Sequence, residues 1–365
     1  MKDNIFITGA TGFFGPRLIK EILAGTRAHL FLLVRPKDSI SAKERVEAAL
    51  KEVMGGGKVS RAFKRITVIE GDVAKKNLGI KKPQLDGLIK KIDTILHCAA
   101  ILDFYMPLEA IRKVNVEGTK NLLDFAYSCS EKGRLRKVGH ISTAYVVGTR
   151  GLNDMVFFEN QLDISQGFNN AYEQSKYEAE LVVEEFRKSG LAIDIYRPSI
   201  MTETMPVKDQ KIFSLFFKPF RFMISGIFKE VPASDDSSYN LVSAEDAARA
   251  ILIISQTNNS RNLNYHIVNP FQIYFGQLLD IAVKVFGIDR PKRIPLKSFN
   301  MDRLTDVQKR LIGPYVPYFN FKARFDDTNA QRLLQKKSFR YHHLKDADIR
   351  SVFEYISENV LSRKP

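Results

Sequence analysis

The chain has 365 residues, of which 44% are hydrophobic and 27% are charged, and its formal net charge at pH 7 is +15. This composition is typical of a globular protein, so it excludes the fibrous and the intrinsically disordered classes. The positive charge favours acidic partners, among them nucleotide phosphates, coenzyme A, an acidic carrier protein, anionic lipid and nucleic acid.

Short β-rich stretches alternate with helical patterns through the first two thirds of the chain. The expected strands span residues 4–9, 29–35, 66–73, 94–100, 137–145 and 192–200. Between them, residues 41–53 and 107–128 have the apolar spacing of helices, and a run of three glycines from Gly55 ends the first of these. This order predicts repeated βαβ units, and hence an α/β protein with the doubly wound parallel sheet of a Rossmann fold.

The alternation stops after residue 200. Residues 201–240 form an insertion rich in Phe, Lys and Pro, after which residues 244–254 predict a helix and residues 265–268 a strand. The sheet is therefore expected to resume after an excursion. Residues 346–361 have the apolar spacing of a terminal helix.

These patterns divide the chain into two interleaved parts. We predict a Rossmann domain in residues 1–200, completed by about residues 241–270. Residues 201–240 and 271–365 then form a smaller, mostly helical lobe that is expected to bind the substrate. A chain of this length can hold both parts in one compact unit.

Three glycines mark the first turn of the predicted sheet. Gly9, Gly12 and Gly15 lie between the first strand and the first helix. Glycine at these places allows a tight turn, close approach of the backbone to a pyrophosphate, and close packing of the helix on the strand. The free N–H groups and the dipole of the helix N-terminus favour the same anion. The turn therefore predicts a dinucleotide-binding site.

The end of the second strand indicates which dinucleotide binds. A site for NAD(H) has an acidic residue about 20 residues after the glycines, whereas this chain has Arg35 there. A guanidinium forms a two-pronged contact with a 2′-phosphate, so we predict NADP(H), with Lys37 and Arg45 assisting. The alternative is that Arg35 is only a solvated charge at a strand end. Asp72, after the third strand, either accepts from the adenine amino group or caps the next turn.

Tyr172 and Lys176 stand four residues apart in a helical pattern, which places both side chains on one helix face. A lysine there lowers the pKa of the phenol and holds the nicotinamide ribose, so that the tyrosine serves as a proton donor near neutral pH. An exposed helix pair without function is the alternative, and the glycine turn weighs against it. The predicted cofactor-binding residues are Gly9, Thr11, Gly12, Phe13, Phe14, Gly15, Arg35, Arg45, Asp72, Val73, Ala99, Ala100, Lys176 and Pro198.

A series of sequence pieces occurs in order over residues 1 to about 200. They are TGATGFFG from Thr8, LLVR ending at Arg35, GDVAKKNLGI from Gly71, HCAAILDF from His97, KVNVEGT from Lys113, HISTAYVVG from His140 and FNNAYEQSKYEAE from Phe168. As an ordered set they resemble the extended short-chain dehydrogenase/reductases. Within these they resemble the branch of fatty acyl-CoA reductases and carrier-protein thioester reductases, which has a male-sterility-type NAD-binding domain. Beyond residue 200 the resemblance fades to the general extended pattern.

The resemblance implies a catalytic Thr-Tyr-Lys arrangement, which falls on Thr143, Tyr172 and Lys176. It also implies that Asn115 supports the lysine, through a water or by holding its helix, and simple helix polarity is the alternative for this residue. Ser142 precedes Thr143, but the spacing to the following glycine favours Thr143. Because neighbours on a strand face opposite ways, only one of these two hydroxyls is expected to point into the site.

The resemblance further implies an NADPH-dependent reductase. Its substrate would be an acyl thioester, on coenzyme A or an acyl carrier protein, or the derived aldehyde, and its product an aldehyde or an alcohol. One alternative is an extended-family enzyme acting on a nucleotide sugar, a sterol or a small ketone. Another is a protein that senses NADP or binds nucleic acid without catalysis. The intact Thr-Tyr-Lys set weighs against this last class, and no nucleic-acid module is recognisable.

Residues 211–229 combine six phenylalanines with four Lys or Arg residues and no acidic residue. As a lid, this segment would line an acyl tunnel and rest on coenzyme A, a carrier protein or anionic lipid. As a core-packing helix, it would break at Pro219. The sequence leaves both interpretations open.

The cysteines and the N-terminus indicate the compartment. Cys98 and Cys129 are too few for a disulfide framework in a chain of this length. The first residues enter a strand at once, which leaves no room for a signal peptide, and no run of about 18 apolar residues could span a bilayer. We therefore expect a cytoplasmic protein, and contact with the surface of a membrane stays open. The six histidines show no metal-ligand spacing, so no metal is predicted.

Overall fold

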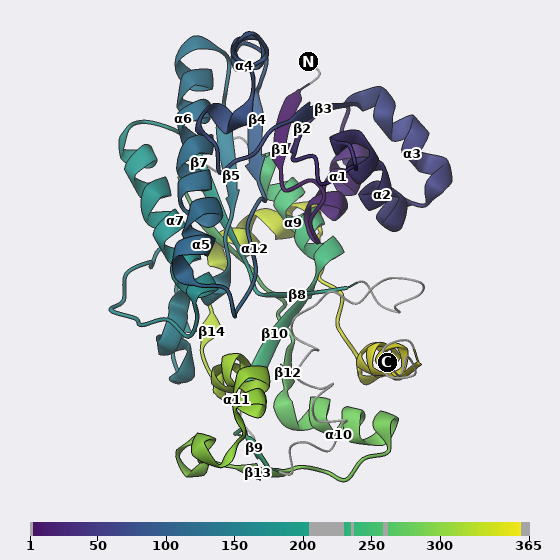
Figure 1. The fold of residues 1–365 in the computed structure, drawn as a ribbon, viewed down its shortest axis with the longest axis vertical. Coiled ribbons are helices and arrows are strands. Elements are labelled where there is room, and N and C mark those ends of the chain that lie inside the picture. Colours follow the sequence, from purple (N-terminus) through teal and green to yellow (C-terminus); the bar gives the residue numbers. More distant parts are fainter. Residues whose placement is uncertain (1–2, 204–229, 235–236, 258–261, 359–365) are drawn as a thin grey trace.

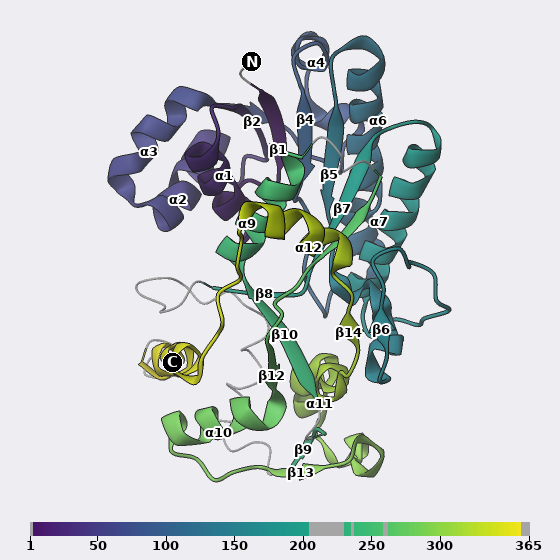
Figure 2. The same ribbon diagram turned by 180° about the vertical axis from the view of Figure 1, so that it is seen from behind.

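A computed structural model of the chain describes residues 3–203, 230–234, 237–257 and 262–358. Within these ranges, seven parallel strands form one sheet in the order β11-β7-β5-β4-β1-β2-β3 (Figures 1 and 2). Their bounds are β1 Asn4–Thr8, β2 His29–Val34, β3 Ile66–Glu70, β4 Thr94–His97, β5 Lys137–Ile141, β7 Ile193–Pro198 and β11 Asn264–Ile267. The strand order reverses between β1 and β4, and such a switch point opens a crevice at the carboxyl ends of the strands. The predicted doubly wound parallel sheet is confirmed.

Helices cover both faces of this sheet (Figures 1 and 2). One face carries α1 (Gly15–Gly25), α2 (Ala42–Met54), α9 (Ala244–Ser255) and α12 (Thr328–Leu334), and the other carries α4 (Lys82–Ile89), α6 (Glu117–Lys132) and α7 (Ala171–Lys188). Ile5 and Ile7 of β1 pack into the first layer and Phe6 into the second. The strands are apolar on both sides because both sides are covered, which explains why they read as continuous β-rich runs.

α2 begins and ends where the sequence predicts. The Ser41 hydroxyl accepts from the Glu44 N–H, and the Glu44 carboxylate accepts from the Ser41 N–H, which is a capping box. Gly55, with φ at 77°, ends the helix. A short helix, α3 (Gly56–Ala62), follows directly, so the glycine run separates two helices and opens no loop between them.

The helix predicted over residues 107–128 is two helices in the structure. α5 spans Leu108–Asn115 and α6 begins at Glu117, with Val116 between them at φ −99° and ψ −61°. The Thr119 hydroxyl donates to the carbonyl oxygen of Asn115 at 2.6 Å. Side-chain bonds to nearby backbone groups compete with the regular helix ladder, and the chain bends here.

Most of the remaining elements pack around a separate apolar cluster beyond the carboxyl ends of the sheet strands (Figure 1), while β6 and β14 belong to a further small cluster. The helices are α10 Phe275–Phe286, α11 Asp306–Ile312 and α13 Asp346–Ile356. The short strands pair as β12-β10-β8, β13-β9 and β14-β6, with bounds β6 Val156–Phe157, β8 Ile200–Thr202, β9 Glu230–Pro232, β10 Ser238–Ser243, β12 Gln272–Tyr274, β13 Lys292–Ile294 and β14 Arg324–Phe325. None of the helices in the described ranges is both long enough and apolar enough to traverse a bilayer.

The predicted return of the chain to the main sheet is confirmed, because β11 pairs with β7. The assignment of the substrate to the lobe stays a prediction. The Phe-rich segment, residues 211–229, lies outside the described residues, as do residues 359–361 of the predicted terminal helix.

Candidate active site

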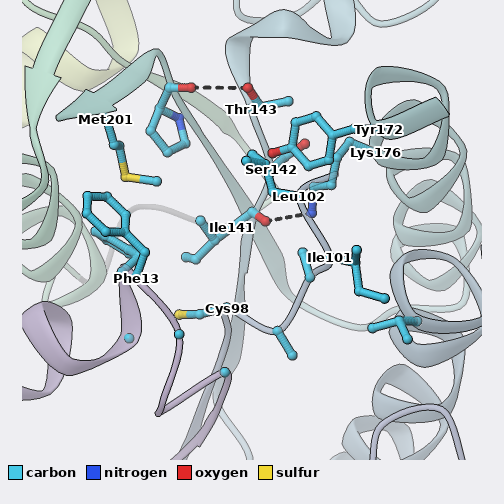
Figure 3. Close-up of a pocket in the computed structure, with 18 of the residues that line it drawn as sticks. Phe13, Cys98, Ile101, Leu102, Ile141, Ser142, Thr143, Tyr172, Lys176 and Met201 are labelled. Atoms are coloured by element: carbon cyan, nitrogen blue, oxygen red, sulfur yellow. Dashed lines mark hydrogen bonds between the residues drawn. The ribbon is translucent and has the colours of Figure 1, made fainter. Parts of the chain in front are cut away.

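A cavity of about 470 Å³ opens at the carboxyl ends of β1, β2, β4 and β5 (Figure 3). Pockets that hold small ligands have volumes of about 300–1,000 Å³. Every predicted cofactor-binding residue lines this cavity, and so do Thr143 and Tyr172, whereas Asn115 and Lys37 do not. The structure therefore brings the separate sequence pieces to one place, while the role of each residue stays a prediction.

The glycine turn has the shape that close approach of a pyrophosphate requires. A Cβ at Gly9 would lie 2.6 Å from the Ala99 nitrogen, and one at Gly15 would lie 2.2 Å from the Gly9 oxygen, so neither position accepts a side chain. At Gly12 the nearest atom to such a Cβ would be 3.5 Å away, so this glycine borders open space. α1 begins at Gly15 after Phe14, whose side chain has no group to cap the free N–H donors. This turn fits the pyrophosphate of a dinucleotide.

Two guanidinium groups border the cavity beside the turn. The exposed Arg35 side chain forms an ion pair with Asp72 at 3.7 Å. Arg45, from α2, donates to the Thr11 hydroxyl at 3.1 Å and to the carbonyl oxygen of Arg35. Asp72 also accepts from the Ala74 N–H at 3.0 Å, so it caps the turn after β3, one of the two roles that the sequence left open. This end of the cavity therefore carries the two guanidinium groups of Arg35 and Arg45 and the carboxylate of Asp72.

The ammonium of Lys176 is held inside the protein. It donates to the Ile141 carbonyl oxygen at 2.8 Å (Figure 3). It also lies 3.4 Å from His140 Nε2. Burial lowers the pKa of Lys176 to about 8. Burial also raises the pKa of Tyr172, and a hydrogen bond with Thr143 opposes that rise. In this structure the ammonium is bonded to Ile141 and Thr143 supplies the opposing bond to the phenol, so the expectation that Lys176 lowers the pKa of Tyr172 stays a prediction.

Two hydroxyl residues follow β5, which ends at Ile141. Thr143 Oγ1 donates to the Pro198 carbonyl oxygen at 3.5 Å and accepts from the Tyr145 N–H at 3.2 Å. The Ser142 hydroxyl is buried and has no hydrogen-bond partner among the described residues. Both residues line the cavity (Figure 3), and which of the two hydroxyls faces the substrate stays a prediction.

Asn115 lies behind the cavity wall and is buried. Its side chain accepts from the Ile101 N–H at 2.7 Å, donates to the Ile101 carbonyl oxygen at 3.0 Å, and donates to the Ser175 hydroxyl at 2.9 Å. It thereby joins the loop after β4 to α7, the helix that carries Tyr172 and Lys176. This geometry corresponds to holding the helix, one of the two ways in which the family resemblance lets Asn115 act.

Aromatic residues that the sequence patterns did not predict line the other side of the cavity. They are Phe104, Tyr145, Tyr239, Tyr315, Tyr318 and Phe319. The Phe104 and Tyr318 rings stack with centroids 5.5 Å apart at 12°. Periodicity gave no signal for these residues, and the one visible sign was the dense aromatic stretch Gly-Pro-Tyr-Val-Pro-Tyr-Phe-Asn over 313–320.

Comparison with known proteins agrees with this geometry. Residues 7–251 match the family of NAD-binding domains described as male sterility protein. A linear gramicidin synthase chain from Brevibacillus parabrevis is 29% identical over 288 residues, which are 78% of this chain and 6% of that protein. Fatty acyl-CoA reductase wat of Drosophila melanogaster is 26% identical over 281 residues, which are 69% of this chain and 54% of that protein.

The fold recurs in solved structures. The terminal R domain from the myxalamid PKS-NRPS biosynthetic pathway superposes with a TM-score of 0.81 at 20% identity, covering 98% of this chain and 91% of that one. The chain spans about half the length of the fly reductase and a small part of the gramicidin synthase. The chain belongs to the male sterility protein family of NAD-binding domains.

Proposed function

We propose that the protein is an NADPH-dependent reductase of acyl thioesters, carried by coenzyme A or a carrier protein, or of the derived aldehydes. The observation that carries this proposal is the meeting of Thr143, Tyr172 and Lys176 in the cavity that also contains the glycine turn. The names of the relatives support it, because they include a fatty acyl-CoA reductase and a reductase domain of a synthetase pathway. The aromatic residues that line the other side of the cavity favour an apolar acyl group over a nucleotide sugar.

In this proposal the chain holds the cofactor at three places. The glycine turn and the N-terminus of α1 bind the pyrophosphate. Arg35 and Arg45 bind the 2′-phosphate through charge-assisted hydrogen bonds. Lys176 binds the hydroxyls of the nicotinamide ribose. When bound, NADPH supplies the hydride that reduces the substrate carbonyl.

The hydroxyls of Thr143 and Tyr172 polarise the substrate carbonyl. As the carbonyl carbon accepts the hydride, negative charge develops on its oxygen, and Tyr172 donates its proton to that oxygen. With a thioester, the resulting hemithioacetal collapses, the C–S bond breaks, and the thiol leaves an aldehyde behind. A second reduction of the aldehyde by the same steps would give the alcohol.

The proposal is tested by following NADPH oxidation with acyl-CoA thioesters and aldehydes of increasing chain length, and by identifying the products. We expect turnover of at least one acyl thioester. The comparison set contains a nucleotide sugar, a sterol and a small ketone. Turnover of a member of that set with no reduction of any thioester or acyl aldehyde would contradict the proposal.

Replacing Arg35 by alanine is expected to raise the KM for NADPH and to leave the KM for NADH unchanged. A hydrogen bond to a charged group contributes about 1.5–3 kcal/mol, which corresponds to roughly a tenfold or larger rise. Lys51→Ala is the control, because this cation of α2 does not line the cavity and has no predicted role in binding the cofactor. Steady-state kinetics with both cofactors measures the effect. An equal loss with NADPH and NADH would show that Arg35 does not bind the 2′-phosphate.

A further inference from the structure

Tyr318 reaches the candidate active site from the C-terminal part of the chain. It belongs to the 3-10 helix Gly313–Asn320, and its ring lines the same cavity as Tyr172. Its hydroxyl donates to Glu173 Oε1 at 2.5 Å and accepts from Asn170 Nδ2 at 2.7 Å. The phenol is thus fixed at its outer end by two residues at the N-terminus of α7.

Glu173 is the residue directly after Tyr172 and has no exposed surface. Its second oxygen accepts from the Asn169 N–H at 2.9 Å and from Asn169 Nδ2 at 3.0 Å. Burial raises the pKa of Glu173 to about 7, and the bonds from Tyr318 and Asn169 oppose that rise. Burying a carboxyl group costs free energy unless hydrogen bonds satisfy it. The position of Glu173 beside the site therefore indicates that it has a role there.

The inner face of Tyr318 is part of an aromatic wall formed by Phe104, Tyr145, Tyr315 and Tyr318. The Tyr318 ring lies 5.5 Å from Phe104 and 5.5 Å from Tyr145, and Phe104 lies 5.7 Å from Tyr315. Phe104 is also 6.3 Å from the ring of Tyr172. A group attached to a carbonyl at Tyr172 would therefore lie against these rings.

We propose that Tyr318 determines the substrate selectivity of this site, that the aromatic wall binds the apolar chain next to the carbonyl, and that Glu173 is the positioning residue that fixes Tyr318. The inference rests on the proposed function and specifies its substrate side. The carboxyl group of Glu173 fixes the Tyr318 ring, so the position of the acyl chain depends on this contact, whereas the bonds from Asn169 to the same carboxyl group hold the start of α7 without Tyr318.

The experiment compares KM, kcat and the Kd for NADPH across an acyl chain-length series. Tyr318→Phe keeps the ring and removes only the anchored hydroxyl. Because a hydrogen bond to a charged group is lost, we expect the KM for longer acyl chains to rise about tenfold, with kcat and the Kd for NADPH unchanged. The difference in KM between long and short acyl chains should become smaller. Tyr341→Phe is the matched control, since this buried phenol lies outside the cavity and its hydroxyl has no hydrogen-bond partner among the described residues.

Variants of Glu173 separate positioning from general structure. Glu173→Gln keeps one acceptor oxygen but replaces the other with an NH2 group, which cannot accept from the Asn169 donors, so its effect on selectivity should be smaller than that of Glu173→Ala. Glu173→Ala should reproduce the effect of Tyr318→Phe, and the double variant should be no worse than either single one, because both changes break the same contact. Additive effects would overturn the role of Glu173.

An unchanged KM and an unchanged chain-length profile in Tyr318→Phe would overturn the proposal for Tyr318. This result is distinguishable from a failure of the proposed function. If the wild-type protein reduces aldehydes but no thioester, the thioester substrate is wrong, and the same KM comparison on the aldehyde series still tests Tyr318. Thermal melting of each variant checks that the fold is retained.

Discussion

Replacing Tyr172 by phenylalanine is expected to lower kcat for carbonyl reduction by about 10²–10⁴-fold, the contribution of a positioned general acid. The Kd for NADPH should stay the same, because the predicted cofactor contacts come from the glycine turn, the two arginines and Lys176. The phenol is buried in the cavity, bonded to Thr143, and its pKa is raised by burial. It therefore keeps its proton through the neutral range until charge develops on the substrate oxygen.

The matched control for this variant is Tyr145→Phe. Tyr145 is also a buried phenol that lines the cavity, and its hydroxyl has no hydrogen-bond partner among the described residues. Single-turnover reduction and NADPH binding by fluorescence are measured on both variants. Equal losses of kcat in the two variants would mean that removing any hydroxyl from the cavity impairs turnover, so the loss would not be specific to Tyr172. Retained turnover in Tyr172→Phe would exclude Tyr172 as the proton donor.

The parts of the site that the sequence predicts follow local rules. Gly9 and Gly15 can be predicted because a tight turn between a β-rich run and a helix allows only glycine at certain positions. In the structure, Gly9 has a φ of 73°. The proximity of Tyr172 and Lys176 can be predicted because helical spacing places both side chains on one helix face. The parallel sheet follows from the same local alternation of strands and helices.

The parts that the sequence does not predict depend on contacts between distant residues. Glu173 and Tyr318 are separated by 145 positions, and Asn115 and Ser175 by 60. Periodicity carries no information on such pairs, so the aromatic wall was missed. The same limit applies to Lys176, because spacing shows the nearby phenol but not the Ile141 carbonyl that binds the ammonium.

Glu180→Gln is expected to destabilise the protein by about 3–5 kcal/mol, the usual cost of breaking a buried ion pair by removing one partner. Glu180 on α7 and Arg197 on β7 are both fully buried, and Arg197 donates to the carboxylate at 2.6 Å and 3.0 Å. The amide keeps the size of the side chain but leaves the guanidinium charge without its counter-ion. Urea unfolding measures the change in the free energy of unfolding. We expect a large change because this pair joins α7 to β7.

The same substitution should also change the pKa of Lys176 in the active site. The Glu180 carboxylate lies one helical turn after Lys176 and raises the pKa of that ammonium against the effect of burial. Its removal should move the pKa of Lys176 below about 8, so the fall in activity that accompanies loss of the ammonium charge should begin at a lower pH. Glu178, also on α7, provides the control: Glu178→Gln breaks its partly exposed pair with Arg112 of α5 and should cost far less stability, because solvent screens such pairs. Equal losses in the two variants would show that the buried pair is no more important than the exposed one.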